Sequence, residues 1–138
     1  MSSASNTVLI TVASWEDRFR SGSERILRER DCERVLMYYF SEYDDWTKEN
    51  RRHVRALCSH RRIPCDEYDL SFGSPVKSWL QIVKTFEPFL VGTRNYIVDI
   101  TTMPRETIWT TFWLLDESGV PVEYVYHKPN DYGELAQP

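Results

Sequence analysis

The strongest constraint on the fold is a set of five short apolar runs that alternate with segments of helical periodicity. The first, at residues 8–13, reads Val-Leu-Ile-Thr-Val-Ala, and such an unbroken run is typical of a strand covered on both faces. The others lie at residues 34–40, 65–70, 95–101 and 122–126. Enough chain separates consecutive runs for a crossover helix, so we expect all five strands to be parallel.

Right-handed crossovers place helices on both faces of such a sheet. The sequence therefore predicts an α/β fold, a single Rossmann-like domain over residues 1–138 with a five-stranded parallel sheet in the expected order 3-2-1-4-5. The run at residues 65–70 is more polar, which indicates a strand at the sheet edge. Residues 127–138 are rich in turn formers and predict an irregular C-terminal tail.

Capping residues and apolar spacing predict four helices. The first is expected over residues 23–30, because Ser21, Gly22 and Ser23 resemble a break followed by a cap. The second is expected over residues 46–62, and the third and fourth begin near Pro75 and Pro104. The core-facing residues predicted on the last three helices are Trp46, Val54, Leu57 and Cys58, then Val76, Trp79, Leu80, Val83 and Phe86, then Ile108, Phe112 and Leu115.

The fourth helix also carries a second apolar stripe. Trp109 and Trp113 are spaced i, i+4 and lie beside the stripe that would face the sheet. A helix that is apolar on two sides is usually buried on two sides, so this stripe predicts a homodimer or a contact with a partner domain. A wide core-facing stripe within one chain is the alternative.

Composition excludes several functional classes. The formal net charge of -4 disfavours non-specific binding to nucleic acid, which needs a surplus of Lys and Arg on one face. The thiols Cys32, Cys58 and Cys65 lack the spacing of a metal site, so we expect reduced structural cysteines, no metal and no cofactor. With neither a leader nor a membrane span recognisable, a cytoplasmic location is the expectation.

Ligands of open parallel α/β sheets bind beyond the carboxyl ends of the strands, where the strand order reverses. In the order 3-2-1-4-5 this point lies between the first and fourth strands. The loop after the first strand offers Ser14, Trp15, Glu16, Asp17 and Arg18, a set able to stack on a base and to bind a phosphate or carboxylate. The alternative is a helix start whose acidic residues complement the dipole.

The loop after the fourth strand faces the first one across this crevice. Thr101 and Thr102 place hydroxyls before a helix N-terminus, and Arg105 could complete an anion site there. Alternatively, one threonine caps the helix and Arg105 is a surface residue. Asp99 falls at strand alternation with Ile97 and Thr101 and would need partners if its carboxylate is buried, and His127 follows the fifth strand as a further candidate ligand contact.

The familiar phosphate-binding motifs are missing from these loops. The chain has no Walker A lysine motif, and Trp15, Glu16 and Asp17 stand where a G-x-G-x-x-G motif would place glycines. A tightly bound dinucleotide is therefore not expected.

With these two loops the chain resembles the CRISPR-associated Rossmann-fold sensor domains, called CARF, and the related SAVED domains of bacterial antiphage defence. In that family, ligand contacts gather in the loop after strand one and in a Thr-containing turn after strand four, which match residues 14–18 and 99–105 here. The turn reads Thr-Thr-Met-Pro-Arg, where many members carry glycines and a lysine. The resemblance also implies a dimer.

The function expected on these grounds is that of a sensor domain that recognises a nucleotide or another phosphate-bearing ligand, with slow hydrolysis as an additional option. An enzyme that cleaves N-glycosidic bonds, of the nucleoside deoxyribosyltransferase-like or TIR-like kind, is the first alternative, with Glu16 or Asp99 as the carboxylate that stabilises the oxocarbenium ion. A non-catalytic interaction module that uses Trp109 and Trp113 is the second.

Overall fold

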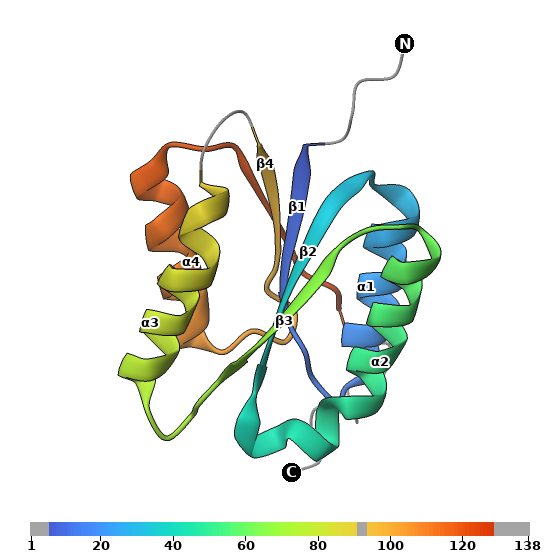
Figure 1. The fold of residues 1–138 in the computed structure, drawn as a ribbon, viewed down its shortest axis with the longest axis horizontal. Helices are drawn as coiled ribbons and strands as arrows, with labels where there is room; N and C mark the ends of the chain where they lie inside the picture. Colours follow the sequence, from blue (N-terminus) through green and yellow to red (C-terminus); the bar gives the residue numbers. More distant parts are fainter. Residues whose placement is uncertain (1–5, 91–93, 129–138) are drawn as a thin grey trace.

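The computed structural model describes residues 6–90 and 94–128. It shows an α/β sandwich in which five parallel strands form one sheet (Figure 1). The strands are β1 (Thr7–Val12), β2 (Cys32–Phe40), β3 (Cys65–Leu70), β4 (Asn95–Asp99) and β5 (Val122–Val125). The helices are α1 (Asp17–Glu29), α2 (Asp44–His60), α3 (Pro75–Phe86) and α4 (Arg105–Ser118), with 3-10 turns η1 (Ser41–Tyr43) and η2 (Glu87–Phe89). The strand order is β3-β2-β1-β4-β5, which confirms the predicted fold and order.

β1 is the central strand of the sheet and pairs with β2 on one side and β4 on the other. Val12 of β1 is in register with Tyr38 of β2, and Thr11 with Asp99 of β4. The chain order reverses between β1 and β4, because β1 and β4 are neighbours in the sheet although two strands separate them in the sequence. The loops after these two strands consequently leave the sheet side by side, and β3 lies at the edge as predicted.

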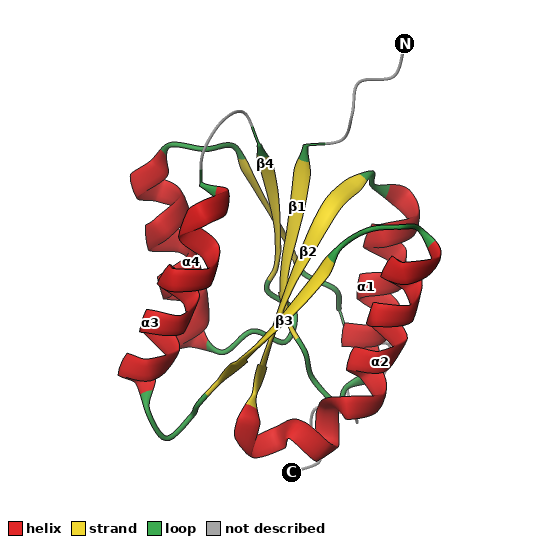
Figure 2. Cartoon of the chain, viewed as in Figure 1, coloured by secondary structure: helices red, strands yellow, loops and turns green. Residues whose placement is uncertain are grey.

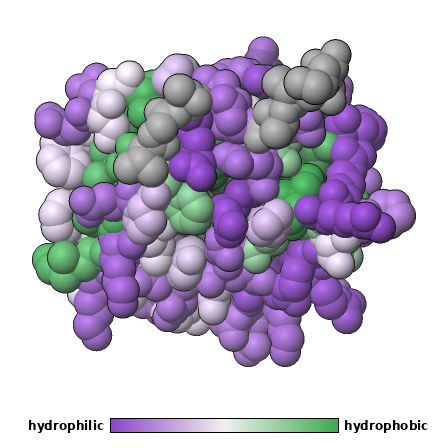
Figure 3. All heavy atoms as spheres, turned by 45° about the horizontal axis from the view of Figure 1, so that its top comes forward, coloured by the Kyte–Doolittle hydropathy of each residue, from purple (hydrophilic) through white to green (hydrophobic). Residues whose placement is uncertain are grey.

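Helices cover both faces of the sheet, α1 and α2 on one and α3 and α4 on the other (Figure 2). Val8, Ile10 and Val12 of β1 pack with α3 and α4, whereas Leu9 and Ala13 pack with α1 and α2. Burial on both faces explains the unbroken apolar run of this strand. The end where the strands begin, seen obliquely in Figure 3, is mostly hydrophilic with smaller hydrophobic areas.

Helix α1 begins at Asp17, so the prediction that it begins at Ser23 was wrong. The residues Ser21, Gly22 and Ser23 lie inside the helix, and Gly22 and Ser23 are buried. Their small size lets the helix approach the end of the sheet: a Cβ atom on Gly22 would lie 2.6 Å from Nδ1 of His127. The sequence that resembled a break is a packing surface.

The face of α2 that packs against the rest of the protein is more polar than the predicted apolar stripe. Trp46 is 69% exposed, which corrects its placement in the core, while Val54 and Cys58 are buried as expected. The side chains of Asn50 and Arg51 are buried beside them. Their polar groups are satisfied, because Asn50 Nδ2 donates to the Ser14 carbonyl at 2.9 Å and Arg51 Nε donates to Thr47 Oγ1 at 3.1 Å.

Helices α3 and α4 likewise bury smaller residues than predicted. Half of the apolar side chains assigned to the core are exposed, namely Val76, Trp79 and Leu80 on α3 and Phe112 on α4. The buried positions include Ser78 and Thr111, whose hydroxyls donate to the carbonyl oxygens of Ser71 at 2.8 Å and Thr107 at 3.0 Å. Local hydrogen bonds make these small polar residues compatible with burial, and the outer side of the two helices is left with large apolar groups.

The segment that follows β5 is described only at its start. β5 ends at Val125, and the predicted tail lies outside the described residues from position 129 onward. Within the described part of the chain, no helix combines the length and the apolar character needed to cross a membrane.

Candidate functional site

A pocket opens at the carboxyl ends of the strands where the chain order reverses. It has a volume of about 110 Å³. The hydroxyl of Thr102 donates to the Val12 carbonyl at 2.8 Å and so ties the loop after β4 to the end of β1. The residues that line this switch-point pocket are Val12, Ala13, Ser14, Trp15, Glu16, Phe40, Tyr43, Thr47, Phe72, Thr102 and Pro104.

The loop after β1 is held rigidly beneath this pocket. Ser14 is buried, its Oγ accepts a hydrogen bond from the Glu16 amide at 3.1 Å, and Asn50 of α2 fixes its carbonyl. The predicted ligand role of Ser14 is thus combined with a structural one. Because the loop is fixed on both sides of it, Trp15 projects outward, with 52% of its surface exposed.

Four aromatic side chains form a continuous cluster at the mouth of the pocket. This aromatic cluster consists of Trp15, Tyr43, Trp46 and Phe72. The Trp15 ring lies 5.3 Å from that of Tyr43 and 6.0 Å from that of Trp46, and Tyr43 lies 5.3 Å from Phe72. These separations are those of interacting aromatic pairs, and all four rings are partly open to solvent.

Sequence reasoning found Trp15 but missed the other three members of the aromatic cluster. Tyr43 follows the end of β2 and Phe72 follows the end of β3, so both lie at the same edge of the sheet as Trp15. An aromatic residue soon after each of β1, β2 and β3 was the available signal. Trp46 was wrongly assigned to the core stripe of α2.

Glu42 of η1 fixes the loop that carries Phe72. Its carboxylate accepts hydrogen bonds from the Ser71 hydroxyl at 2.8 Å and from the amides of Phe72 and Gly73, both at 3.1 Å. The backbone amide of Gly73, followed by its own and that of Phe72 and by the Ser71 hydroxyl, lowers the pKa of Glu42 from 4.5 to about 2. Phe72 in turn stacks on buried Phe40, with ring centroids 3.9 Å apart.

This arrangement predicts an unusually acidic titration of Glu42. A pKa that folding lowers stabilises the folded loop above pH 4.5, and this stabilisation is lost as the pH falls through 2. In an NMR titration the carboxyl carbon of Glu42 should have its midpoint near pH 2, and Ser71→Ala should raise that midpoint because one donor is lost. A midpoint near 4.5 in the unmodified protein would contradict the contact.

Arg18 lies outside the pocket, against the end of the chain's last strand. Its Nε donates to Glu16 Oε1 at 3.0 Å and its Nη1 donates to the hydroxyl of Tyr126 at 3.1 Å. The guanidinium therefore links the loop after β1 to the segment after β5. A ligand contact by Arg18, which the sequence predicted, would require it to leave these partners.

Asp99, Thr101 and His127 form a separate polar cluster on the α1 side of the sheet. Asp99 is buried, and its Oδ1 accepts from the amide of Thr101 at 3.0 Å and from the Thr101 hydroxyl at 2.5 Å. Nδ1 of His127 lies 3.1 Å from the Thr101 hydroxyl and 3.7 Å from Asp99 Oδ1, and Gly22 closes the other side of the ring. The predicted residues meet here, but they do not line the switch-point pocket.

Two helices begin at the pocket without a side-chain cap. Glu16 before α1 and Pro104 before α4 make no capping hydrogen bond with their side chains, and among the described residues the first amides of α4 have no side-chain acceptor, so that they could bind an anion. Arg105 is the first residue of α4 and is exposed, with no ion pair to any described residue. Arg18 and Arg105 thus belong to helices on opposite faces of the sheet.

Of the residues predicted for the site, Ser14, Trp15, Glu16 and Thr102 line the switch-point pocket, and the others are not among its lining residues.

No protein-family model and no curated protein matches this chain. Among the described residues, no group of three or more His, Cys, Asp or Glu side chains is arranged to hold a metal ion. The lining residues can offer aromatic stacking, hydrogen bonding from hydroxyls and helix amides, and the carboxylate of Glu16.

Proposed function

We propose that this protein is a sensor domain that binds a nucleotide in the switch-point pocket. The observation that carries the proposal is Trp15, a half-exposed indole held at the pocket mouth beside Tyr43 and Phe72. An indole in this position offers a flat surface to a base, and stacking of one base on an aromatic side chain is worth about 1–3 kcal/mol. The place also agrees with the general site of ligands in open α/β sheets.

The phosphate of such a ligand would lie toward α4. The uncapped first turn of α4 follows Thr102 and Pro104, which line the pocket, and Arg105 adds an unpaired cation among the described residues. Helix amides with a nearby guanidinium are a common phosphate site. The same arrangement accounts for the preference for a mononucleotide over a dinucleotide, because the pocket is small and its loops lack the usual glycines.

Replacing Trp15 by alanine should weaken nucleotide binding by about 10- to 100-fold, which corresponds to the loss of one base stack. Calorimetry with the common mononucleotides would first identify the bound base and then measure the change. Tyr124→Ala removes another partly exposed aromatic residue, one far from the pocket lining, and should leave the affinity unchanged. Equal affinity of the Trp15 variant and the unmodified protein would refute stacking.

Replacing Arg105 by alanine should cost about 1–3 kcal/mol of binding free energy for a nucleotide, the typical value for a lost hydrogen bond to a charged group. The corresponding nucleoside, which has no phosphate, should bind the variant and the unmodified protein alike. Arg52→Ala, at an exposed arginine of α2, is the matched control. If the nucleotide and the nucleoside lose equal affinity, Arg105 does not contact the phosphate.

A second candidate function is cleavage of an N-glycosidic bond. It is favoured by Glu16, the one carboxylate among the described lining residues of the switch-point pocket, whereas Asp99 lies in the other cluster. Release of free base during incubation with the bound nucleotide, abolished by Glu16→Gln, would support this activity. Saturable binding without any product supports the sensor.

We further propose that a second copy of the chain covers the outer side of α3 and α4. The exposed apolar residues there form one apolar face, which consists of Val76, Trp79, Leu80, Trp109, Phe112 and Trp113. The rings of Trp79 and Trp113 lie 6.2 Å apart, so the face is continuous from one helix to the other. Such a face is typical of an interface, and a two-fold dimer lets the same surface serve both subunits.

A further inference from the structure

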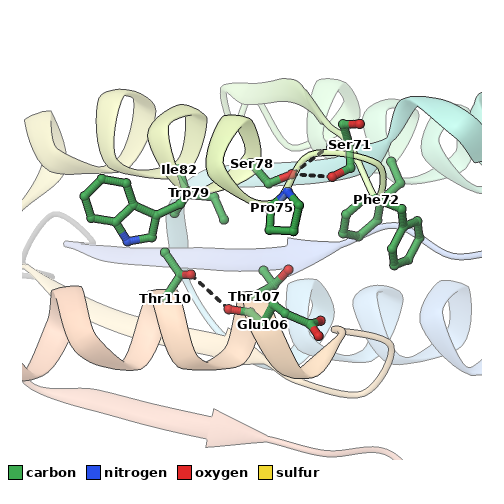
Figure 4. Close-up of a pocket in the computed structure, with 10 residues that line it drawn as sticks. Ser71, Phe72, Pro75, Ser78, Trp79, Ile82, Glu106, Thr107 and Thr110 are labelled. Atoms are coloured by element: carbon green, nitrogen blue, oxygen red, sulfur yellow. Dashed lines mark hydrogen bonds between the residues drawn. The ribbon is translucent and has the colours of Figure 1, made fainter.

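A second pocket lies between the first turns of α3 and α4 (Figure 4). Its volume is about 190 Å³, and it is separated from the switch-point pocket by Phe40 and Phe72, which line both. Its other walls are apolar for the most part, with Trp79 at one end and Pro75 and Ile82 along the side of α3. An apolar ring would be enclosed between these side chains.

Most of the polar groups in this pocket already have partners. The Ser78 hydroxyl donates to the Ser71 carbonyl and accepts from the Ser71 amide at 2.9 Å, and the Thr110 hydroxyl donates to the Glu106 carbonyl at 2.9 Å. Thr107 differs from them. It is only 3% exposed, and its hydroxyl points into the pocket without a hydrogen bond to any described residue (Figure 4).

The Thr107 hydroxyl stays accessible from the pocket, although most of the residue is covered. A ligand that brings a polar group to Thr107 would form a hydrogen bond with it. The pocket therefore combines an apolar enclosure with one unused hydrogen-bonding group deep inside it, as small-molecule sites commonly do.

The charge of the pocket indicates the sign of the ligand. Glu106 is the one ionisable residue among its described lining residues, so that a carboxylate, but no cation, faces the space. An anionic ligand would be repelled, whereas an ammonium group could pair with Glu106. This preference is opposite to that of the phosphate region at Arg105.

We propose that the pocket between α3 and α4 binds a small organic amine with an apolar ring. The ring lies between Trp79 and Phe72, and the ammonium group donates to the carboxylate of Glu106 and to the hydroxyl of Thr107. This site shares Phe40 and Phe72 with the switch-point pocket, but Glu106 and Thr107 line only this one, so it can be tested independently of the nucleotide site.

Three indole probes of similar size, whose side chains end in groups of different charge, test the proposal. Tryptamine carries an ammonium, tryptophol a hydroxyl and indole-3-acetate a carboxylate. By calorimetry or NMR, tryptamine should bind with a dissociation constant on the order of 1 mM, as expected for a ligand of this size. It should bind roughly 10-fold more tightly than tryptophol, and indole-3-acetate should bind most weakly.

Two variants test whether Glu106 and Thr107 bind the probes. Glu106→Gln should abolish the preference for tryptamine over tryptophol, while Glu117→Gln, at an exposed position at the far end of the same helix, should preserve it. Thr107→Val keeps the shape of the side chain and should weaken both probes, and circular dichroism checks that the variant is folded. The proposal is overturned if the three probes bind equally, if none binds at millimolar concentration, or if the preference survives in Glu106→Gln.

Discussion

Substituting Gly22 by alanine should lower the free energy of unfolding by about 1–2 kcal/mol, although alanine is normally the better helix former. The new methyl group would lie 2.6 Å from Nδ1 and 3.0 Å from Cγ of His127, and Thr101 and Asp99 hold that ring in place. Overpacking of this kind costs about 1–3 kcal/mol, whereas the gain in helix propensity is at most about 1 kcal/mol. Urea unfolding followed by circular dichroism measures the difference.

The effect of Gly22→Ala on the free energy of unfolding should be reversed when the side chain of His127 is removed. In a His127→Ala background the space beside Gly22 is open, so Gly22→Ala should raise the free energy of unfolding by up to about 1 kcal/mol. The two backgrounds would then differ by about 2 kcal/mol or more, a coupling typical of residues in contact. Ser21→Ala, at the exposed neighbouring position, should behave alike in both backgrounds. Destabilisation by Gly22→Ala in both would contradict the contact.

The strands could be predicted from the sequence because their pattern has one main cause. A strand such as β1 is buried on both faces, so it needs apolar residues at nearly every position, and few other structures produce a short run of this kind. The polar residues of β3 likewise reported its edge position. Once the runs were parallel and separated by helices, few strand orders remained.

The faces of the helices were harder to predict because size and hydrogen bonding compete with hydrophobicity there. Gly22, Ser78 and Thr111 are buried where a helix approaches the sheet closely or where a hydroxyl bonds a nearby carbonyl. Trp46 is apolar but exposed, because it contacts Trp15 and not the sheet. A periodicity that counts only apolar residues assigns such positions to the wrong side.

The sequence predicted the location of the candidate site more accurately than the side chains that line it. The rule for parallel sheets located the loops after β1 and β4, and Trp15 and Thr102 do line the pocket between them. The rotation of individual side chains could not be deduced. Arg18 donates to Tyr126, and His127 is packed on Gly22, and both contacts join positions distant in the sequence.

The buried residues of α4 show which of its apolar side chains belong to the core. The sheet contact of α4 is made by Leu114, Leu115 and two buried threonines, so the tryptophans are not needed for the core. Trp109 is 65% exposed and Trp113 48% exposed. The interpretation of this stripe as a wide core face is therefore wrong, and the apolar face of α3 and α4 is available to a partner.

Changing both Trp109 and Trp113 to glutamate should convert a dimer into a folded monomer. Two buried tryptophans at the centre of an interface contribute about 2 kcal/mol each or more, so the dimer dissociation constant should rise by at least about 1,000-fold. Circular dichroism should remain unchanged because both indoles lie outside the core. Trp46→Glu, at an equally exposed tryptophan on α2, should leave the dimer intact. Sedimentation velocity determines the oligomeric state of the unmodified protein and of both variants. If the unmodified chain sediments as a monomer at high micromolar concentration, this face does not join two copies.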